Sequence, residues 1–78
     1  MNCFFVQIKS ELGRTYEVAA ALADAEIASE IHSTSGTYDL LAKFYIADDD
    51  DIGLFVADSV QTIPGIRDTF TLIAFRAF

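Results

Sequence analysis

The chain has 78 residues, enough to enclose one hydrophobic core, so the sequence predicts a single domain over residues 1–78. Hydrophobic residues make up 53% of it, which is more apolar surface than one small core hides, and we expect partner subunits to cover the excess. Five basic residues stand against 12 acidic ones, a formal net charge of −7. This balance argues against direct contact with nucleic acid, because tight binding draws on clustered Lys and Arg.

Cysteine content and hydropathy narrow the class of protein further. Cys3 is the only cysteine, so the sequence predicts no internal disulfide and no thiolate cluster for a metal. Polar Gln7 and charged Lys9 interrupt an N-terminal apolar run that is too short for a secretory signal. No stretch approaches the ~18 consecutive apolar residues of a membrane span. We therefore expect a cytoplasmic protein without a cofactor.

The first half of the chain changes its apolar period from strand to helix and back. Residues 3–9 alternate as a strand does, and Thr15 is predicted to cap an Ala-rich helix over residues 16–24. Residues 27–34 and 37–47 are rich in β-branched and aromatic side chains and flank Ser35 and Gly36. Two such runs around a Ser-Gly turn are typical of a β-hairpin.

The second half adds a helix and a strand. Apolar residues from Ile52 to Ile63 fall on one helical stripe, Pro64 and Gly65 end it, and residues 66–75 alternate as a last strand. The order strand, helix, strand, strand, helix, strand predicts an α+β, ferredoxin-like βαββαβ fold, a four-stranded antiparallel sheet with two helices on one face.

The other face of the predicted sheet has no cover within the chain. A second copy packed sheet to sheet, as a dimeric α/β barrel, would cover it. The apolar residues expected on that face are Phe5, Leu41, Tyr45, Ile73 and Phe75.

Four consecutive aspartates, Asp48 to Asp51, precede the second predicted helix. A calcium loop needs oxygen ligands at alternate positions and a glutamate at the twelfth, whereas here the fifth position is Ile52 and the twelfth is Ser59. N-capping and the positive end of the helix dipole explain the run better. We expect Asp48 or Asp49 to be the cap and no metal to bind.

His32 is the only histidine and alternates with its neighbours on a predicted strand. Nucleophilic catalysis requires a nucleophile beside a base, usually with a third group that orients the base. The sequence offers no such set, so we interpret His32 as a surface or interface residue and expect no enzymatic or catalytic residues.

Residues 33–39 gather hydroxyls, a glycine, a phenol and a carboxylate around one turn. A free amino acid needs donors for its α-carboxylate and an acceptor for its α-ammonium. Backbone N–H groups near Gly36 and the Ser and Thr hydroxyls are such donors, and Asp39 is such an acceptor. The alternative is that Ser35 and Gly36 only turn the chain and that Asp39 caps the turn.

Two motifs of the chain resemble those of one known family. They read Ser35-Gly36-Thr37-Tyr38-Asp39-Leu40-Leu41 and Ile63-Pro64-Gly65-Ile66-Arg67-Asp68-Thr69. The chain is similar, over almost its whole length, to the effector domain of the Lrp/AsnC (leucine-responsive, feast/famine) transcription regulators. The resemblance implies a ferredoxin-like domain that pairs through its sheets into homodimers, often assembles into octamers, and holds amino-acid effectors between dimers. Carried over by position, the effector-binding residues would be Ser35, Gly36, Thr37, Tyr38 and Asp39 in the turn, with Leu72, Ile73 and Ala74 on the last strand.

Typical members of that family begin with a helix-turn-helix domain of roughly half the chain, and these 78 residues contain none. We expect a stand-alone effector domain that modulates the regulation of amino-acid metabolism without contacting DNA. It would bind and buffer an amino acid, or co-assemble with full-length regulators of the family. Two alternatives stay open: a small dimeric α/β-barrel enzyme of the monooxygenase type, and a purely structural oligomerisation module. On the last strand, sheet core or interface is the alternative role for Leu72 to Ala74.

Overall fold

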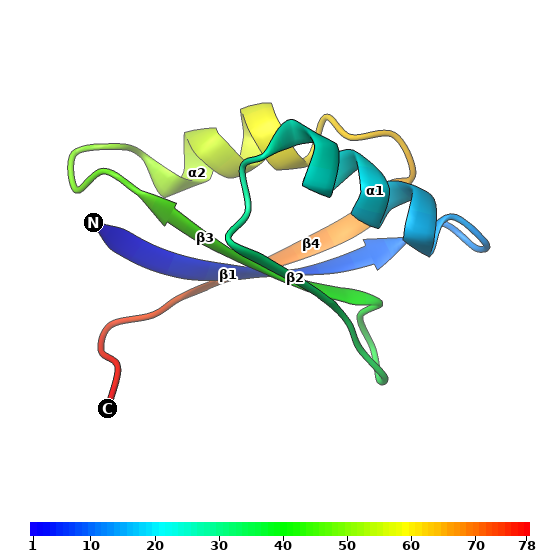
Figure 1. The fold of residues 1–78 in the computed structure, drawn as a ribbon, viewed down its shortest axis with the longest axis horizontal. Helices are drawn as coiled ribbons and strands as arrows, with labels where there is room; N and C mark the ends of the chain where they lie inside the picture. The colour runs from blue at the N-terminus through cyan, green and yellow to red at the C-terminus, as the bar shows by residue number, and fades with distance from the viewer.

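All 78 residues are described by a computed structural model of the chain. Its elements are β1 Asn2–Ser10, α1 Thr15–Ala25, β2 Glu30–Ser33, β3 Leu40–Ile46, α2 Ile52–Phe55, the π-helical turn η1 Val56–Val60, and β4 Ile66–Ile73. The strands form one antiparallel sheet in the order β2-β3-β1-β4. Both helical segments cover the same face of this sheet (Figure 1). The predicted α+β βαββαβ fold is confirmed.

The core lies between the sheet and the helices, because alternate residues of the two central strands face the helices. Phe4 and Phe44 stack there with their ring centroids 5.2 Å apart, and Phe55 meets both rings edge-on. The buried apolar residues of the core are Phe4, Val6, Ile8, Val18, Leu22, Leu40, Ala42, Phe44, Ile46, Val56 and Val60. None of the helices has the length and apolar character that crossing a bilayer requires.

The ends of the helices differ from the sequence-based expectations. Thr15 was expected to cap α1, but it is the first residue of the helix, and the capping position belongs to Arg14, whose side chain makes no capping bond. The second helix was expected as one stripe to Ile63. It changes at Val56 to π-helical bonding, where the N–H of Gln61 donates to the carbonyl of Val56 at 2.8 Å.

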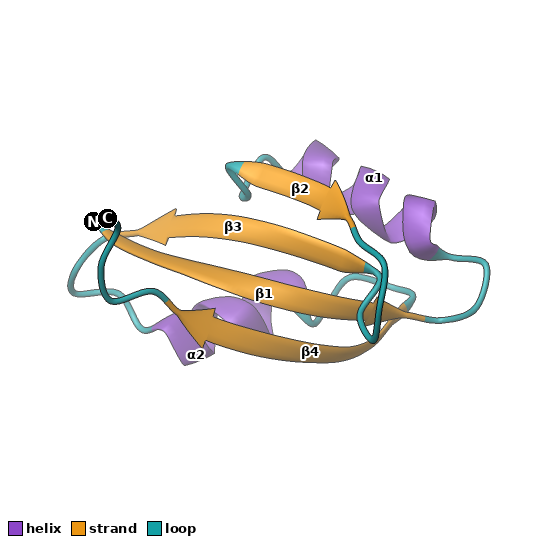
Figure 2. Cartoon of the chain, turned by 90° about the horizontal axis from the view of Figure 1, so that it is seen from below, coloured by secondary structure: helices purple, strands orange, loops and turns teal.

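Figure 2 views the sheet from the face opposite the helices, which no helix covers. The residues of the other alternation lie on this face. Phe5 lies opposite Lys43 and Leu72, and Gln7 lies opposite Leu41 and Phe70. Directly paired residues share a face. We call this surface the open face. Its residues are Cys3, Phe5, Gln7, Leu41, Lys43, Tyr45, Phe70 and Leu72.

One residue expected on the open face lies elsewhere. Ile73 pairs with Phe4 and therefore points to the helix side. Phe75 follows the end of β4 and lines a hollow together with Phe5 and Tyr45 of the open face. The expectation was right for Phe5, Leu41 and Tyr45 and wrong for Ile73. Both alternations of β4 contain large apolar residues, so the sequence pattern did not identify the correct face.

Candidate functional site

The turn from Thr34 to Asp39 joins β2 to β3 and projects from the sheet on the side away from the helices (Figure 1). It is wider than the expected Ser-Gly hairpin, because the N–H of Thr34 donates to the carbonyl of Asp39 at 2.9 Å. Inside it, the Thr34 hydroxyl donates to the Tyr38 carbonyl and the Lys9 ammonium donates to the Thr37 carbonyl, both at 3.0 Å. Gly36 has φ +107°, a conformation that favours glycine.

The backbone of this turn presents unused donors. The N–H groups of the four consecutive residues Ser35 to Tyr38 make no hydrogen bond within the chain, whereas their flanking neighbours, Thr34 and Asp39, are both bonded. Successive free backbone N–H groups in a turn form a concavity that suits an anion.

A hollow of about 410 Å³ opens beside the turn on the open face. Its lining residues are Gln7, Thr34, Ser35, Thr37, Tyr38 and Leu41. The Tyr38 ring also stacks on Phe70 of β4, with centroids 6.2 Å apart. Three of the expected effector residues therefore line one hollow. Sequence reasoning did not identify Gln7 and Leu41, because they come from β1 and β3 and not from the turn. The one indication in the sequence was Gln7 itself, an uncharged amide within an apolar strand.

Asp39 is oriented by a different contact. Its Oδ2 accepts the backbone N–H of Ser10 at 2.9 Å and the Ser10 hydroxyl at 3.1 Å. These two bonds hold the pKa of the Asp39 carboxyl below its ordinary value. Asp39 is half-buried, is not among the residues that line the hollow, and its Oδ1 makes no hydrogen bond.

The residues expected on the last strand do not line the hollow beside the turn. Leu72 pairs with Phe5, whereas Ile8, at the turn end of β1, pairs with Thr69. Ala74 lines a second hollow of about 480 Å³, with Cys3, Lys43 and Tyr45 among its other residues. Within one protomer, Leu72, Ile73 and Ala74 do not meet the turn.

Two further expectations concern charged residues outside the turn. His32 is exposed on β2 and its Nε2 lies 3.1 Å from Glu30 Oε1, which confirms it as a surface strand residue. The helix cap is Asp51, whose Oδ1 accepts the N–H of Leu54 at 3.0 Å. Asp48, expected as a cap, instead pairs with the N-terminal ammonium at 3.1 Å. Asp51 is the cap because it directly precedes the first helical residue.

Comparison with known protein families places the chain in one of them. A family model described as the Lrp/AsnC ligand binding domain matches residues 3–78. The chain belongs to this family. The matched range includes the whole sheet apart from its first residue, both helical segments and the turn from Thr34 to Asp39.

Members of the Lrp/AsnC family with related sequences include full regulators and short chains. An HTH-type transcriptional regulator of Pyrococcus abyssi, FL11, is 32% identical over 72 residues, which cover 92% of this chain and 47% of FL11. The chain thus spans about half the length of the curated relatives it matches.

Two solved structures match over nearly their full lengths. TTHA0845 from Thermus thermophilus superposes with a TM-score of 0.88 at 31% identity, and the superposition covers 100% of this chain and 98% of TTHA0845. The hypothetical protein PHS023 from Pyrococcus horikoshii superposes with a TM-score of 0.84 at 26% identity, and the superposition covers 99% of this chain and 93% of PHS023.

Proposed function

We propose that this chain binds a free amino acid as a small-molecule effector at the turn from Thr34 to Asp39. The observation that carries the proposal is the row of four unused N–H groups from Ser35 to Tyr38 beside the hollow. A carboxylate accepts several hydrogen bonds at once, and charge-assisted bonds from backbone N–H groups are strong. The α-carboxylate of the effector would lie against these groups.

The surroundings of the turn suit a zwitterion. Lys9 places a positive charge 3.0 Å from the Thr37 carbonyl, near the proposed carboxylate position. Hydroxyls of Ser35 and Thr37 add donors at the rim of the hollow. Asp39 has one oxygen bonded to Ser10 and the other, Oδ1, free to accept an α-ammonium. The α-ammonium and the α-carboxylate of an amino acid are attached to the same carbon atom, so both contacts would be made at one end of the effector against this turn.

A second protomer would complete the site. The open face is apolar at Phe5, Leu41 and Leu72, and a copy packed on it would cover these side chains. Because Leu72, Ile73 and Ala74 do not line the hollow in their own protomer, they would reach an effector there as residues of a neighbouring copy. A Neisseria meningitidis regulator with the same fold (TM-score 0.82, 17% identity) has been crystallised as an L-Met complex, which makes L-Met the first probe.

The role that follows is regulatory. Binding between protomers would change the assembly of this chain, alone or with longer regulators of the Lrp/AsnC family. Basic residues are scarce, five against 12 acidic ones, which supports a role without direct contact to DNA.

The experiment is a thermal-shift screen of the twenty amino acids followed by calorimetric titration of those that stabilise. A site-specific effector at 100 times its Kd adds about 2.7 kcal/mol to the free energy of unfolding. Two analogues of L-Met act as controls: the amine without its carboxylate and the N-acetyl derivative should both bind more weakly. Failure of all twenty amino acids to bind at millimolar concentration would contradict the proposal.

Asp39→Asn tests the ammonium contact separately. The amide oxygen of Asn still accepts the bonds from Ser10, but the charge is gone, so affinity should fall by about tenfold or more. Equal affinities for the two proteins would limit Asp39 to a structural role.

A further inference from the structure

Ser10 is the only buried polar residue of the chain, with 7% of its surface exposed. It is the last residue of β1, and its side chain faces the helices in line with Phe4, Val6 and Ile8. Three hydrogen bonds meet at this residue. Its N–H and its hydroxyl donate to Asp39 Oδ2 at 2.9 and 3.1 Å, and its Oγ lies 2.6 Å from the Thr15 hydroxyl.

The carboxylate of Asp39 stands where a backbone carbonyl of β3 would accept the next hydrogen bond from β1. Alternate residues of β1 direct their backbone groups toward β3, and the last paired residue there is Ile8, opposite Leu40. The N–H of Ser10 lies one step beyond the start of β3, where no β3 carbonyl faces it. Asp39 Oδ2 accepts this N–H and so extends the β1–β3 pairing by one bond. The turn is thereby fixed to β1 at both its backbone, through Asp39 N–H to Ile8 O at 2.9 Å, and its side chain.

The hydrogen bonds around Ser10 have one possible direction. An ionised carboxylate only accepts, so the Ser10 hydroxyl donates to Asp39. Its single proton is then used, and the Thr15 hydroxyl must be the donor in the 2.6 Å contact with Ser10. The chain of bonds runs from Thr15, the first residue of α1, through Ser10 to Asp39.

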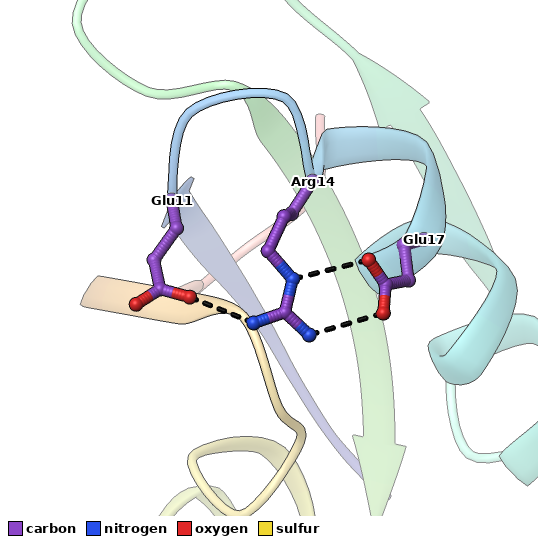
Figure 3. A network of polar contacts seen from close by, with 3 residues as sticks. All are labelled: Glu11, Arg14 and Glu17. Atoms are coloured by element: carbon purple, nitrogen blue, oxygen red, sulfur yellow. Dashed lines mark hydrogen bonds and ion pairs between the residues drawn. The ribbon is translucent and has the colours of Figure 1, made fainter.

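The start of α1 is itself held firmly. Arg14 donates to both carboxylate oxygens of Glu17 at 3.0 Å and to Glu11 at 2.8 Å, which bridges the β1–α1 connection (Figure 3). The N–H of Glu11 donates to the carbonyl of Gly65 at 2.8 Å. Ser10 therefore joins the exposed turn to a helix start that other contacts already fix.

We propose that Ser10 is a positioning residue for the effector turn, and that the bonds from Thr15 through Ser10 to Asp39 couple the turn to the first turn of α1. The effector part of this inference rests on the proposed function, whereas the coupling between Thr15 and Asp39 does not. An ammonium group on Asp39 Oδ1 would draw negative charge away from Oδ2, weaken the bonds from Ser10 and so be sensed at Thr15.

The first test needs no ligand. The Asp39 side-chain carboxyl is titrated by NMR in wild type, Ser10→Ala and Ser10→Thr. The backbone N–H of residue 10, the main cause of the lowered pKa, remains in the Ala variant, so the pKa of Asp39 should rise part of the way toward its ordinary value. The N–H groups of Thr34 and Asp39 should also exchange faster with solvent. The Thr variant, which keeps the hydroxyl, should restore both. An unchanged titration and unchanged exchange in Ser10→Ala would overturn the positioning role.

The second test is a double-mutant cycle between Thr15→Val and Asp39→Ala, which removes the acceptor of the two bonds from Ser10. The unfolding equilibrium constants should be non-additive by roughly twofold or more, and the non-additivity should vanish when the cycle is repeated on Ser10→Ala. Additive effects in the wild-type background would overturn the coupling, and Thr15→Val, whose side chain keeps its shape, provides this readout even if Ser10→Ala does not fold.

Binding of L-Met is measured last. Ser10→Ala should bind L-Met several-fold more weakly than Ser10→Thr. If no amino acid binds the wild type while the titration and the cycle behave as stated, the proposed effector function fails and the coupling stands. If L-Met binds both variants equally, the turn does not depend on Ser10 for its binding shape.

Discussion

The ring of Tyr38 stacks on Phe70, with centroids 6.2 Å apart and an angle of 28° between the ring planes. This contact joins the turn to β4, an edge strand that the turn does not otherwise pair with. A double-mutant cycle with Tyr38→Ala and Phe70→Ala should give a coupling of about 0.5 to 1.5 kcal/mol in the free energy of unfolding, the usual range for aromatic pairs. Coupling near zero would mean that the two rings do not stabilise each other in solution.

The open face should form the contact between protomers. We expect a dimer or larger species at micromolar concentration, measured by light scattering with chromatography. Leu72→Asp places a charge on the open face and should shift the protein to monomer, because a charge buried at an interface without a partner is costly. Leu54→Asp is the matched control, since Leu54 is 61% exposed on α2, on the helix side of the sheet. A stable 8.6 kDa wild-type monomer would contradict this account of the open face.

The acid side of the stability curve should depend on Asp39. Its pKa is lowered from the ordinary value of 3.8, chiefly by the backbone N–H of Ser10 and then by the hydroxyl. A carboxyl whose pKa is lower in the folded state stabilises the fold while ionised, so this contribution is complete above the ordinary value and disappears as the pH falls through the lowered one. Urea unfolding of wild type and Asp39→Asn should show a constant difference near neutrality that shrinks below pH 3.8. Glu17 and Glu30 also have lowered pKa values, but both remain in each protein and cancel in the difference.

The aspartate run should stabilise α2 through one residue. Asp51→Ala removes the acceptor for the Leu54 N–H and should cost about 0.5 to 2 kcal/mol of unfolding free energy. Asp49→Ala is the control, because Asp49 makes no hydrogen bond or ion pair. Calcium should leave the melting temperature of both variants unchanged. A larger loss for Asp49→Ala than for Asp51→Ala would contradict this assignment of the cap.

Local patterns in the sequence were sufficient for the fold. The period of two in β1 and β3 and the helical stripes predicted the order of elements and the open-face positions of Phe5, Leu41 and Tyr45. These patterns did not predict which residues of β4 lie on the open face. Phe70 and Leu72 alternate with Ile73 and Phe75, and either pair is apolar enough to be buried. The change to π-helical bonding at Val56 has no signal in the apolar stripe, which continues across it.

The candidate site was predictable only in part. The turn was recognised from its glycine, hydroxyls and carboxylate, which are neighbours in sequence. The partner of Asp39 was not, because Ser10 precedes it by 29 positions and comes close only when β1 pairs with β3. For the same reason, the sequence did not show that Leu72 to Ala74 lie outside the hollow beside the turn.

The most direct test of the account is an amide NMR titration of the wild-type protein with L-Met, and with any other amino acid that the thermal screen identifies. If the turn receives the α-carboxylate, the N–H signals of Ser35, Gly36, Thr37 and Tyr38 should shift downfield and saturate together, and the amine lacking the carboxylate should leave them in place. Saturable binding that shifts only the residues around Ala74 and Tyr45, or shifts that do not need the carboxylate, would contradict the claim that this turn receives an amino acid.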